Sequence, residues 1–349
     1  MNPGLRAAID SASSIEALAA LSREFREQVR QVVADGHEAA QVTACISETN
    51  DALCARIVEL EGEAARLDIE HCWIVMGSQG RREQTLHTDQ DNAIIFSTPG
   101  DAEAARRALC TSARRINEQM SRCGIPLCRG NIMGGNPQWC LTLAEWKTRF
   151  ASWLDFGHPE ALLNAAIFFD FRPLVGAVAL ASDLRAWLAQ RSRDHTRFLL
   201  QLTCSALENR PPLGLFDRFI LSKHGDVAHA IDLKVNGVTP FVDAARVYGL
   251  AGGVLDTGTI ARFEGAAAAS LMNVAQSRVW IEAFSSLQKL RLRAQARTMN
   301  APTASANVVD PDHLSPDERR TLKHALRQAQ RLQQWLTRDF AGLTPGLGA

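Results

Sequence analysis

The chain has 349 residues, 46% of them hydrophobic and 22% charged, and its 38 basic residues are balanced by 38 acidic ones. This composition is typical of globular proteins and excludes disordered and collagen-like chains, and the length predicts two domains. Zero net charge argues against a general basic field that would coat nucleic acid or an anionic membrane, although a local basic patch stays open. No apolar run approaches the roughly 18 residues that span a bilayer, and no signal peptide is visible, so we expect a cytoplasmic protein.

The eight cysteines show no paired spacing. In a reducing compartment we expect free thiols. Cys123, Cys128 and Cys140 are the one cluster that could suggest a metal site, but zinc ligands usually come in pairs two to four residues apart. We therefore expect buried, small apolar residues at these positions.

Helices and two strands are predicted in the first part of the chain. From Ser13 to about Leu67, apolar residues recur at spacings of three and four, which predicts helices. The short apolar runs at 72–76 and 93–96 break this rhythm and predict two buried strands. An alanine-rich helix should follow over 101–122, with Asp101 near its start, where a carboxylate favours the helix dipole.

Beyond this helix we expect short strands within 125–133 and then a mostly helical half. Helix-period apolar positions occur in the segments 142–154, 159–170 and 176–209. The segment 299–313 is predicted to be a loop. The last helix should begin at Ser315, because Ser315-Pro316-Asp317-Glu318 combines an N-cap serine, an N1 proline and a capping-box glutamate.

Two short motifs flank the loop between the predicted strands. Gly77-Ser78 ends the first strand, where a glycine lets the backbone approach a ligand and the N–H groups of a following helical turn can bind phosphate. Asp89 and Asp91 stand at the head of the second strand, on one face because of the period of two. Two carboxylates on one face can hold Mg²⁺ while the metal also binds substrate phosphates.

The predicted elements follow each other in the order strand, Gly-Ser, ten residues, Asp-x-Asp, strand. This pattern resembles the nucleotidyltransferase superfamily that includes DNA polymerase beta and kanamycin nucleotidyltransferase. More narrowly, it resembles the DUF294-type nucleotidyltransferase family, which is related to the N-terminal part of protein-PII uridylyltransferase. Further matching segments cover roughly residues 40–340. They are Gly80-Arg81, Thr88–Ala93, Cys128–Met133, Asn136–Trp139, Phe169–Gly176, Ile231–Lys234, Ala245-Arg246, Thr259–Arg262 and Leu290–Gln295.

The resemblance implies roles for individual residues. Asp89 and Asp91 would ligate Mg²⁺ or Mn²⁺, and Gly77 and Ser78 would hold the nucleoside triphosphate. Two further residues have equally plausible structural explanations. Arg81 could neutralise phosphate charge or form a salt bridge with Glu83, and Lys234 could face the nucleotide or form an ion pair with Asp232 or another acid.

Two positions bear on proton transfer. His87 lies between the motifs, and we expect a loop histidine that makes a backbone hydrogen bond in preference to a general base. Many superfamily members carry a third carboxylate on a later strand, where this chain offers Asn131, which cannot take a proton. Because Asn131 stands in place of this carboxylate, the sequence leaves open whether the chain is catalytically active.

We therefore expect an α+β protein with a small mixed sheet flanked by helices, followed by a mostly helical C-terminal domain. The expected boundaries are 1–35 for an N-terminal helical segment, 36–173 for the nucleotidyltransferase domain and 174–349 for the helical, substrate-binding-like domain. The expected activity is Mg²⁺-dependent transfer of a nucleoside monophosphate from UTP or ATP to a hydroxyl, on a protein. Neither nucleic acid nor a membrane is expected as a partner. The alternative is a nucleotide-binding regulatory module with little or no turnover.

Overall fold

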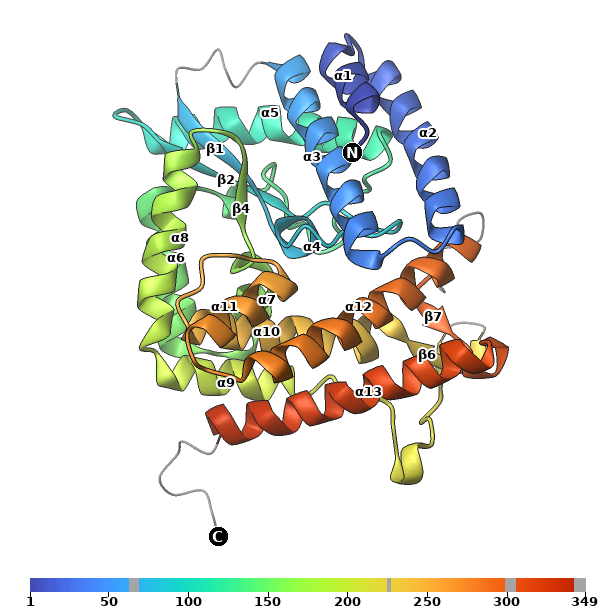
Figure 1. Cartoon of the computed structure of the whole chain (residues 1–349). Coiled ribbons are helices and arrows are strands. Elements are labelled where there is room, and N and C mark those ends of the chain that lie inside the picture. Colours follow the sequence, from blue (N-terminus) through green and yellow to red (C-terminus); the bar gives the residue numbers. More distant parts are fainter. Residues whose placement is uncertain (63–68, 225–226, 299–305, 342–349) are drawn as a thin grey trace. The chain divides into compact units, whose positions relative to one another are not determined.

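The computed structural model describes residues 1–62, 69–224, 227–298 and 306–341 (Figure 1). The end of the helical stretch predicted to reach Leu67 and residues 299–305 of the predicted loop lie outside this part of the chain. Contacts divide the chain into two units. The first comprises Met1–Gly36, Gln41–Trp153 and Ile167–Leu188, and the second comprises His37–Ala40, Leu154–Ala166 and Ala189–Ala349. Helices and small sheets occur together, which confirms the α+β class.

The first unit is built on a four-stranded mixed sheet in the order β3-β2-β1-β4. β1 pairs antiparallel with β2 and with β4, whereas β2 and β3 run parallel. The strands are β1 (Glu70–Val75), β2 (Asn92–Ser97), β3 (Cys140–Thr142) and β4 (Arg172–Gly176). The helices that begin in this unit or contribute to it are α1 (Pro3–Ser11), α2 (Ile15–Ala34), α3 (Ala39–Glu61), α4 (Gly77–Gly80), α5 (Ala102–Arg122), α6 (Leu143–Phe156), α7 (Pro159–Phe168) and α8 (Val178–Arg193).

Both faces of the two central strands are buried, which explains why their sequences are continuously apolar. Alternate residues pack into a core with side chains from α1, α2, α3 and α5. These residues are Trp73, Val75, Ile94 and Phe96. The residues between them are buried as well, namely Cys72, Ile74, Ala93 and Ile95.

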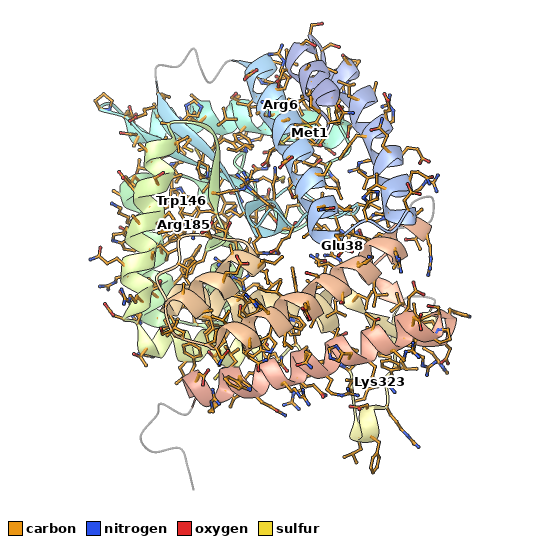
Figure 2. The ribbon with its side chains drawn as sticks, viewed as in Figure 1. Met1, Arg6, Glu38, Trp146, Arg185 and Lys323 are labelled. Atoms are coloured by element: carbon orange, nitrogen blue, oxygen red, sulfur yellow. The ribbon has the colours of Figure 1, made fainter. Side chains whose placement is uncertain are left out.

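Polar side chains of two helices form hydrogen bonds with the sheet and with the segment before β4. Trp146 and Arg185 are labelled in Figure 2. Trp146 on α6 donates its indole N–H to Ile94 O at 3.0 Å. Arg185 on α8 donates to Phe169 O at 2.8 Å and also to Phe171 O, directly before β4. The first unit therefore needs residues beyond 166 to complete its sheet.

Some sequence-based expectations need correction. Residues 125–133 form no strand; instead, single hydrogen bonds join them to the start of β2, from Gln90 N to Pro126 O and from Asn92 N to Ile132 O. β4 lies between the predicted helical segments 159–170 and 176–209, in a part of the chain that was expected to be mostly helical. Contacts group residues 1–36 and 174–188 with the sheet, and the domain boundaries at residues 35 and 173 stay a prediction.

The second unit is mostly helical, with a small antiparallel sheet in the order β5-β6-β7. Its helices are α9 (Thr196–Ala206), α10 (Thr239–Ala251), α11 (Thr259–Ala268), α12 (Val274–Arg297) and α13 (Pro316–Leu336), with a π-helix, η4 (Leu233–Val238). Its strands are β5 (Ser222–His224), β6 (Val227–Asp232) and β7 (Val308–Val309). The predicted capping box is present at α13, where Ser315 and Glu318 cap each other. None of the described helices is long and apolar enough to cross a membrane.

Candidate functional site

The turn after β1 brings Gly77 against Asp91, two residues that the sequence assigns to one site. Met76 N donates to Asp91 O at 2.9 Å, which joins the end of β1 to the start of β2. Gly77 has a φ of +54°, in the left-handed region, and a Cβ atom there would lie 2.5 Å from Asp91 Oδ2. Glycine is therefore the residue that lets this carboxylate lie against the backbone.

The short helix α4 presents backbone N–H groups to an incoming anion. Within the described residues, the N–H groups of Gly77, Ser78 and Gln79 donate to no acceptor, whereas Gly80 N donates to Met76 O at 2.8 Å. Successive N–H groups without partners form a concave anion-binding surface. The predicted phosphate-binding residues Gly77 and Ser78 thus have the donors that this role requires.

A chain of polar contacts connects Ser78 to helix α3. Ser78 Oγ lies 3.4 Å from Thr88 Oγ1, which also accepts a hydrogen bond of 3.2 Å from Gln84 Nε2. Asn50 on α3 donates its side-chain N–H to Gln84 Oε1 at 3.1 Å. The segment between the two motifs is therefore held by α3, which lies far upstream in the sequence.

The two predicted metal ligands alternate with two buried amides. Asp89 is exposed and Asp91 is half-buried, whereas Gln90 and Asn92 are almost fully buried. Because successive side chains of an extended segment point to opposite faces, the carboxylates share one face and the amides the other.

The amides form a hydrogen-bonded network with helix α5. Asn117 Nδ2 donates to Gln90 Oε1 at 2.8 Å and to Asn92 Oδ1 at 3.1 Å. Gln90 Nε2 donates to Asn117 O at 2.9 Å and to Ile125 O at 2.7 Å, and Asn92 Oδ1 accepts from Gly134 N at 2.8 Å. Sequence reasoning missed this network, although the alternation around Asp89 and Asp91 already placed Gln90 and Asn92 on the opposite face.

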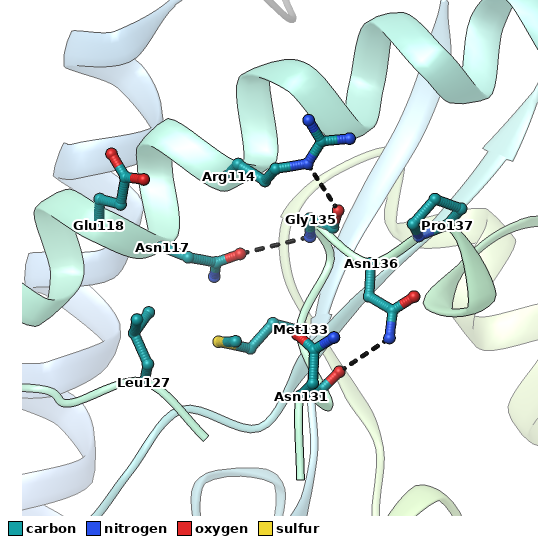
Figure 3. Close-up of a pocket in the computed structure, with 9 residues that line it drawn as sticks. All are labelled: Arg114, Asn117, Glu118, Leu127, Asn131, Met133, Gly135, Asn136 and Pro137. Atoms are coloured by element: carbon teal, nitrogen blue, oxygen red, sulfur yellow. Dashed lines mark hydrogen bonds between the residues drawn. The ribbon is translucent and has the colours of Figure 1, made fainter. Parts of the chain in front are cut away.

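A cavity of about 320 Å³ adjoins this network, between α5 and the segment that follows it (Figure 3). It is lined by Arg114, Asn117, Glu118, Leu127, Asn131, Met133, Gly135, Asn136 and Pro137. Asn117 Oδ1 accepts from Gly135 N at 3.3 Å, and Arg114 Nε donates to Gly135 O at 3.2 Å. Asn117 thus belongs both to the cavity wall and to the support of the carboxylate segment.

Arg81 forms ion pairs with protein carboxylates. Its guanidinium donates to Glu83 Oε2 at 2.9 Å and to Asp170 Oδ2 at 2.6 Å, and its side chain is only 13% exposed. The salt bridge considered from the sequence is therefore present, and the phosphate-binding role of Arg81 stays a prediction.

A second ion pair, absent from the sequence analysis, fixes the backbone of α4. Arg172 Nη2 donates to Asp51 Oδ2 at 2.6 Å and to Gln79 O at 2.9 Å. Gln79 Nε2 donates to Asp51 Oδ1 at 3.0 Å. A helix and an edge strand from distant parts of the chain thereby hold the segment that carries the unpaired N–H groups.

No carboxylate occupies the position expected for a third acid. Asn131 is exposed, has a φ of +53°, and its carbonyl accepts a hydrogen bond of 3.1 Å from Asn136 Nδ2. The residues of β3, the strand parallel to β2, are Cys140, Leu141 and Thr142. Neither segment supplies a proton acceptor of the carboxylate kind.

Lys234 lies in the second unit, in η4, and is exposed. The carboxylate of Asp232 caps this helix, because its Oδ1 accepts from Lys234 N at 2.8 Å and from Val235 N at 2.9 Å. Asp232 therefore binds the backbone N–H of Lys234, and a contact between the Lys234 ammonium and a nucleotide stays a prediction.

The donor set at Asp89 and Asp91 suits a cation that is shared with a substrate. Burial raises the pKa of the nearby Cys128 thiol, and the charges of Asp91 and Asp89 raise it further, so both carboxylates act on one region. Among the described residues, no group of three or more His, Cys, Asp or Glu side chains could hold a metal. Mg²⁺ typically binds one or two carboxylates together with substrate phosphates and water, so two carboxylates beside unpaired N–H groups fit this ion.

Comparison with family models gives two matches. The model described as "Putative nucleotidyltransferase DUF294" matches residues 23–160, and the model described as "Putative nucleotidyltransferase substrate binding domain" matches residues 196–340. No curated protein matches the chain.

Proposed function

Because the chain belongs to the DUF294 family of nucleotidyltransferases, we propose that it transfers a nucleoside monophosphate from UTP or ATP to a protein hydroxyl. One observation carries this proposal. Gly77, Ser78 and Gln79 offer unpaired N–H groups at the point where the backbone meets the Asp91 carboxylate. The proposed phosphate-binding N–H groups therefore lie beside Asp91, a proposed metal ligand, which supports nucleotidyl transfer.

The chain's own residues would divide the work as follows. Asp89 and Asp91 would hold Mg²⁺, which when bound would neutralise the negative charge of the triphosphate. The N–H groups of α4 would bind phosphate oxygens, and the absence of a side chain at Gly77 would let them approach. The acceptor hydroxyl would lose its proton to water as its oxygen forms a bond to the α-phosphorus. The bond from the α-phosphorus to the bridging β-phosphate oxygen would break, and pyrophosphate would leave with its electron pair.

The donor and the acceptor are proposed on different grounds. Resemblance to protein-PII uridylyltransferase favours UTP, with ATP as the other donor. The balanced charge of the chain favours a protein hydroxyl over a nucleic-acid end, because a polynucleotide needs a broad cationic track.

One observation favours a second function, a nucleotide-binding regulatory module. Neither β3 nor Asn131 provides a carboxylate to accept the proton of the attacking hydroxyl. The two functions differ in turnover, since a regulatory module would bind triphosphate without releasing pyrophosphate.

The test combines binding with turnover. Purified protein is incubated with Mg²⁺ and each triphosphate, labelled at the α-phosphate, together with cell lysate or mixed RNA. We expect pyrophosphate release and label on protein. Label on RNA ends alone would contradict the proposed acceptor, and binding without pyrophosphate release would favour the regulatory module.

Asp89→Ala and Asp91→Ala should abolish Mg²⁺-dependent triphosphate binding without unfolding the protein, since the remaining carboxylate alone holds the ion weakly. Asp183→Ala, which removes an exposed carboxylate from α8, is the matched control and should bind as the wild type does. Wild-type affinity after removal of both Asp89 and Asp91 would refute the site.

A further inference from the structure

An exposed apolar tip projects from the second unit. The segment 213–221 extends beyond α13 and is drawn in yellow (Figure 1). Leu215 is 84% exposed and Phe216 93% exposed, and Ile220 and Leu221 behind them are exposed as well. Large apolar side chains that cluster on a projecting surface commonly mark a site of association.

The tip is held in a defined conformation. Phe216 and Asp217 have φ values of +56° and +55°, a left-handed conformation that residues with a Cβ rarely adopt. Gly214 N donates to Arg218 O at 2.8 Å across the base of the tip, and Asp217 forms an ion pair with Arg327 on α13. These contacts keep Leu215 and Phe216 pointed away from their own unit.

Helix α13 places a row of positive charges beside the tip. Arg319, Lys323, Arg327 and Arg331 follow each other at intervals of four, and no acidic residue occurs between Glu318 and Asp339. The guanidinium carbon of Arg319 and the ammonium of Lys323 lie 5.5 Å and 5.4 Å from the centre of the ring of Phe219, which belongs to the segment 213–221. Lys323 is labelled in Figure 2.

The positive charges of this row act on the carboxylate of Asp217 in the tip. Arg327 lowers the pKa of Asp217 by hydrogen bonding and by its charge, and the charges of Lys323 and Arg331 lower it further. Asp217 pairs with Arg327 and Asp312 pairs with Arg319, so the two remaining cations of the row, Lys323 and Arg331, leave the surface around the tip with net positive charge.

We propose that the tip and the basic row of α13 dock the protein on an anionic lipid surface. Leu215 and Phe216 enter the boundary between headgroups and acyl chains, and Lys323 and Arg331 bind headgroup phosphates. The apolar side chains project furthest and the cations lie behind them. This order matches a lipid surface, where apolar acyl chains lie beneath charged headgroups. Nucleic acid explains the charges but not Leu215, Ile220 and Leu221, because aliphatic side chains offer no ring for base stacking. The site revises the expectation that no membrane is a partner, and it is independent of the proposed transferase function.

The test is co-sedimentation of the full chain with vesicles of phosphatidylcholine, with and without phosphatidylglycerol. We expect binding to the anionic vesicles that weakens as salt is raised. Leu215→Asp and Phe216→Asp should each lower the affinity roughly tenfold or more, because each loses a buried apolar side chain. Lys323→Gln and Arg331→Gln should lower it about fivefold per charge.

Leu255→Asp is the matched control, since Leu255 is an exposed leucine of the same unit outside the tip. It should bind anionic vesicles as the wild type does, and circular dichroism should show that all variants are folded. Equal binding to neutral and anionic vesicles, or binding that survives Phe216→Asp, would overturn the proposal. The proposal would also be overturned if the wild type did not bind vesicles and light scattering showed self-association that Phe216→Asp abolishes. The tip would then join two copies of the chain.

Discussion

A single methyl group tests the geometry at Gly77. Gly77→Ala would place Cβ 2.5 Å from Asp91 Oδ2 and would force a left-handed conformation on alanine. We expect a loss of roughly 1 to 2 kcal/mol in the free energy of unfolding, and a larger loss of triphosphate binding, because Asp91 must move. Gly100→Ala is the control, since its nearest neighbour would be Thr98 Oγ1 at 3.8 Å. Titration calorimetry with UTP and ATP would measure the difference, and unchanged binding in Gly77→Ala would contradict this account.

Asn117 supports the carboxylate segment from behind. Asn117→Ala would leave the buried side chains of Gln90 and Asn92 without a shared partner, so we expect a loss of about 1 to 3 kcal/mol in the free energy of unfolding. The concentration of Mg²⁺ needed for half-maximal triphosphate binding should also rise. Glu118→Ala, at the next and exposed position of α5, should stay within about 0.5 kcal/mol of the wild type. Urea denaturation and Mg²⁺ titration measure both effects, and a change in stability alone would restrict Asn117 to a structural role.

The sequence predicts the part of the site that is local in the chain. Gly77, Ser78, Asp89 and Asp91 form a pattern in which each short motif adjoins an apolar strand. The supporting residues Asn117, Asp51 and Arg172 meet the motifs only in three dimensions, because their partners are distant in sequence. An isolated Asn or Arg on a helix or edge strand carries no signal of such a partner.

The start of α13 depends on the charge of Glu318. Burial raises the pKa of Glu318, but hydrogen bonds from Ser315 and the charges of Arg297 and Arg293 outweigh it and lower the pKa overall. A carboxyl group with a lowered pKa stabilises the fold above its unfolded pKa, near 4.3, and loses that contribution as the pH falls through the folded pKa.

We therefore expect Glu318→Gln to be less stable than the wild type by roughly 0.5 to 1 kcal/mol at pH 7, with this difference fading below about pH 4. Glutamine keeps the capping box, so the difference isolates the charge. Guanidinium would screen the ion pairs, so urea denaturation at several pH values is the measurement. A difference that persists at pH 3 would show that the charge of Glu318 is not its source.

Elements with a strong local pattern are predicted correctly, and those defined by distant pairing are not. β1 and β2 are buried on both faces and are therefore apolar throughout. β4 reads Arg-Pro-Leu-Val-Gly, is only half-buried, and lies at the edge of the sheet, where a proline is tolerated. The five residues of β4 carry no sequence pattern that would predict pairing with β1. Residues 125–133 contain apolar positions, but they bond to β2 at isolated points and form no ladder.

At the scale of the whole molecule, the first unit is discontinuous. A fragment that ends at residue 160 would lack β4 and the hydrogen bonds that Arg185 makes before it, whereas a fragment that ends at residue 188 would contain all of the first unit. We expect fragment 1–188 to unfold cooperatively on heating and fragment 1–160 to show a broad, weak transition, because the outer edge of β1 would be unpaired. Circular dichroism at increasing temperature measures both, and an equally sharp transition in fragment 1–160 would show that β4 is dispensable.

The pairing of β1 with β4 also sets an order of events during synthesis. Val75 pairs with Arg172, so the ribosome releases β1 about 100 residues before its edge partner, a delay of roughly 5 to 20 s at typical rates of translation. Over that interval β1 can pair with β2 on one side while its other side offers free backbone groups next to Trp73 and Ile74. Such an edge recruits other strands. A released chain truncated before residue 172 should therefore be more prone to aggregate and to bind chaperones than one that extends to residue 188.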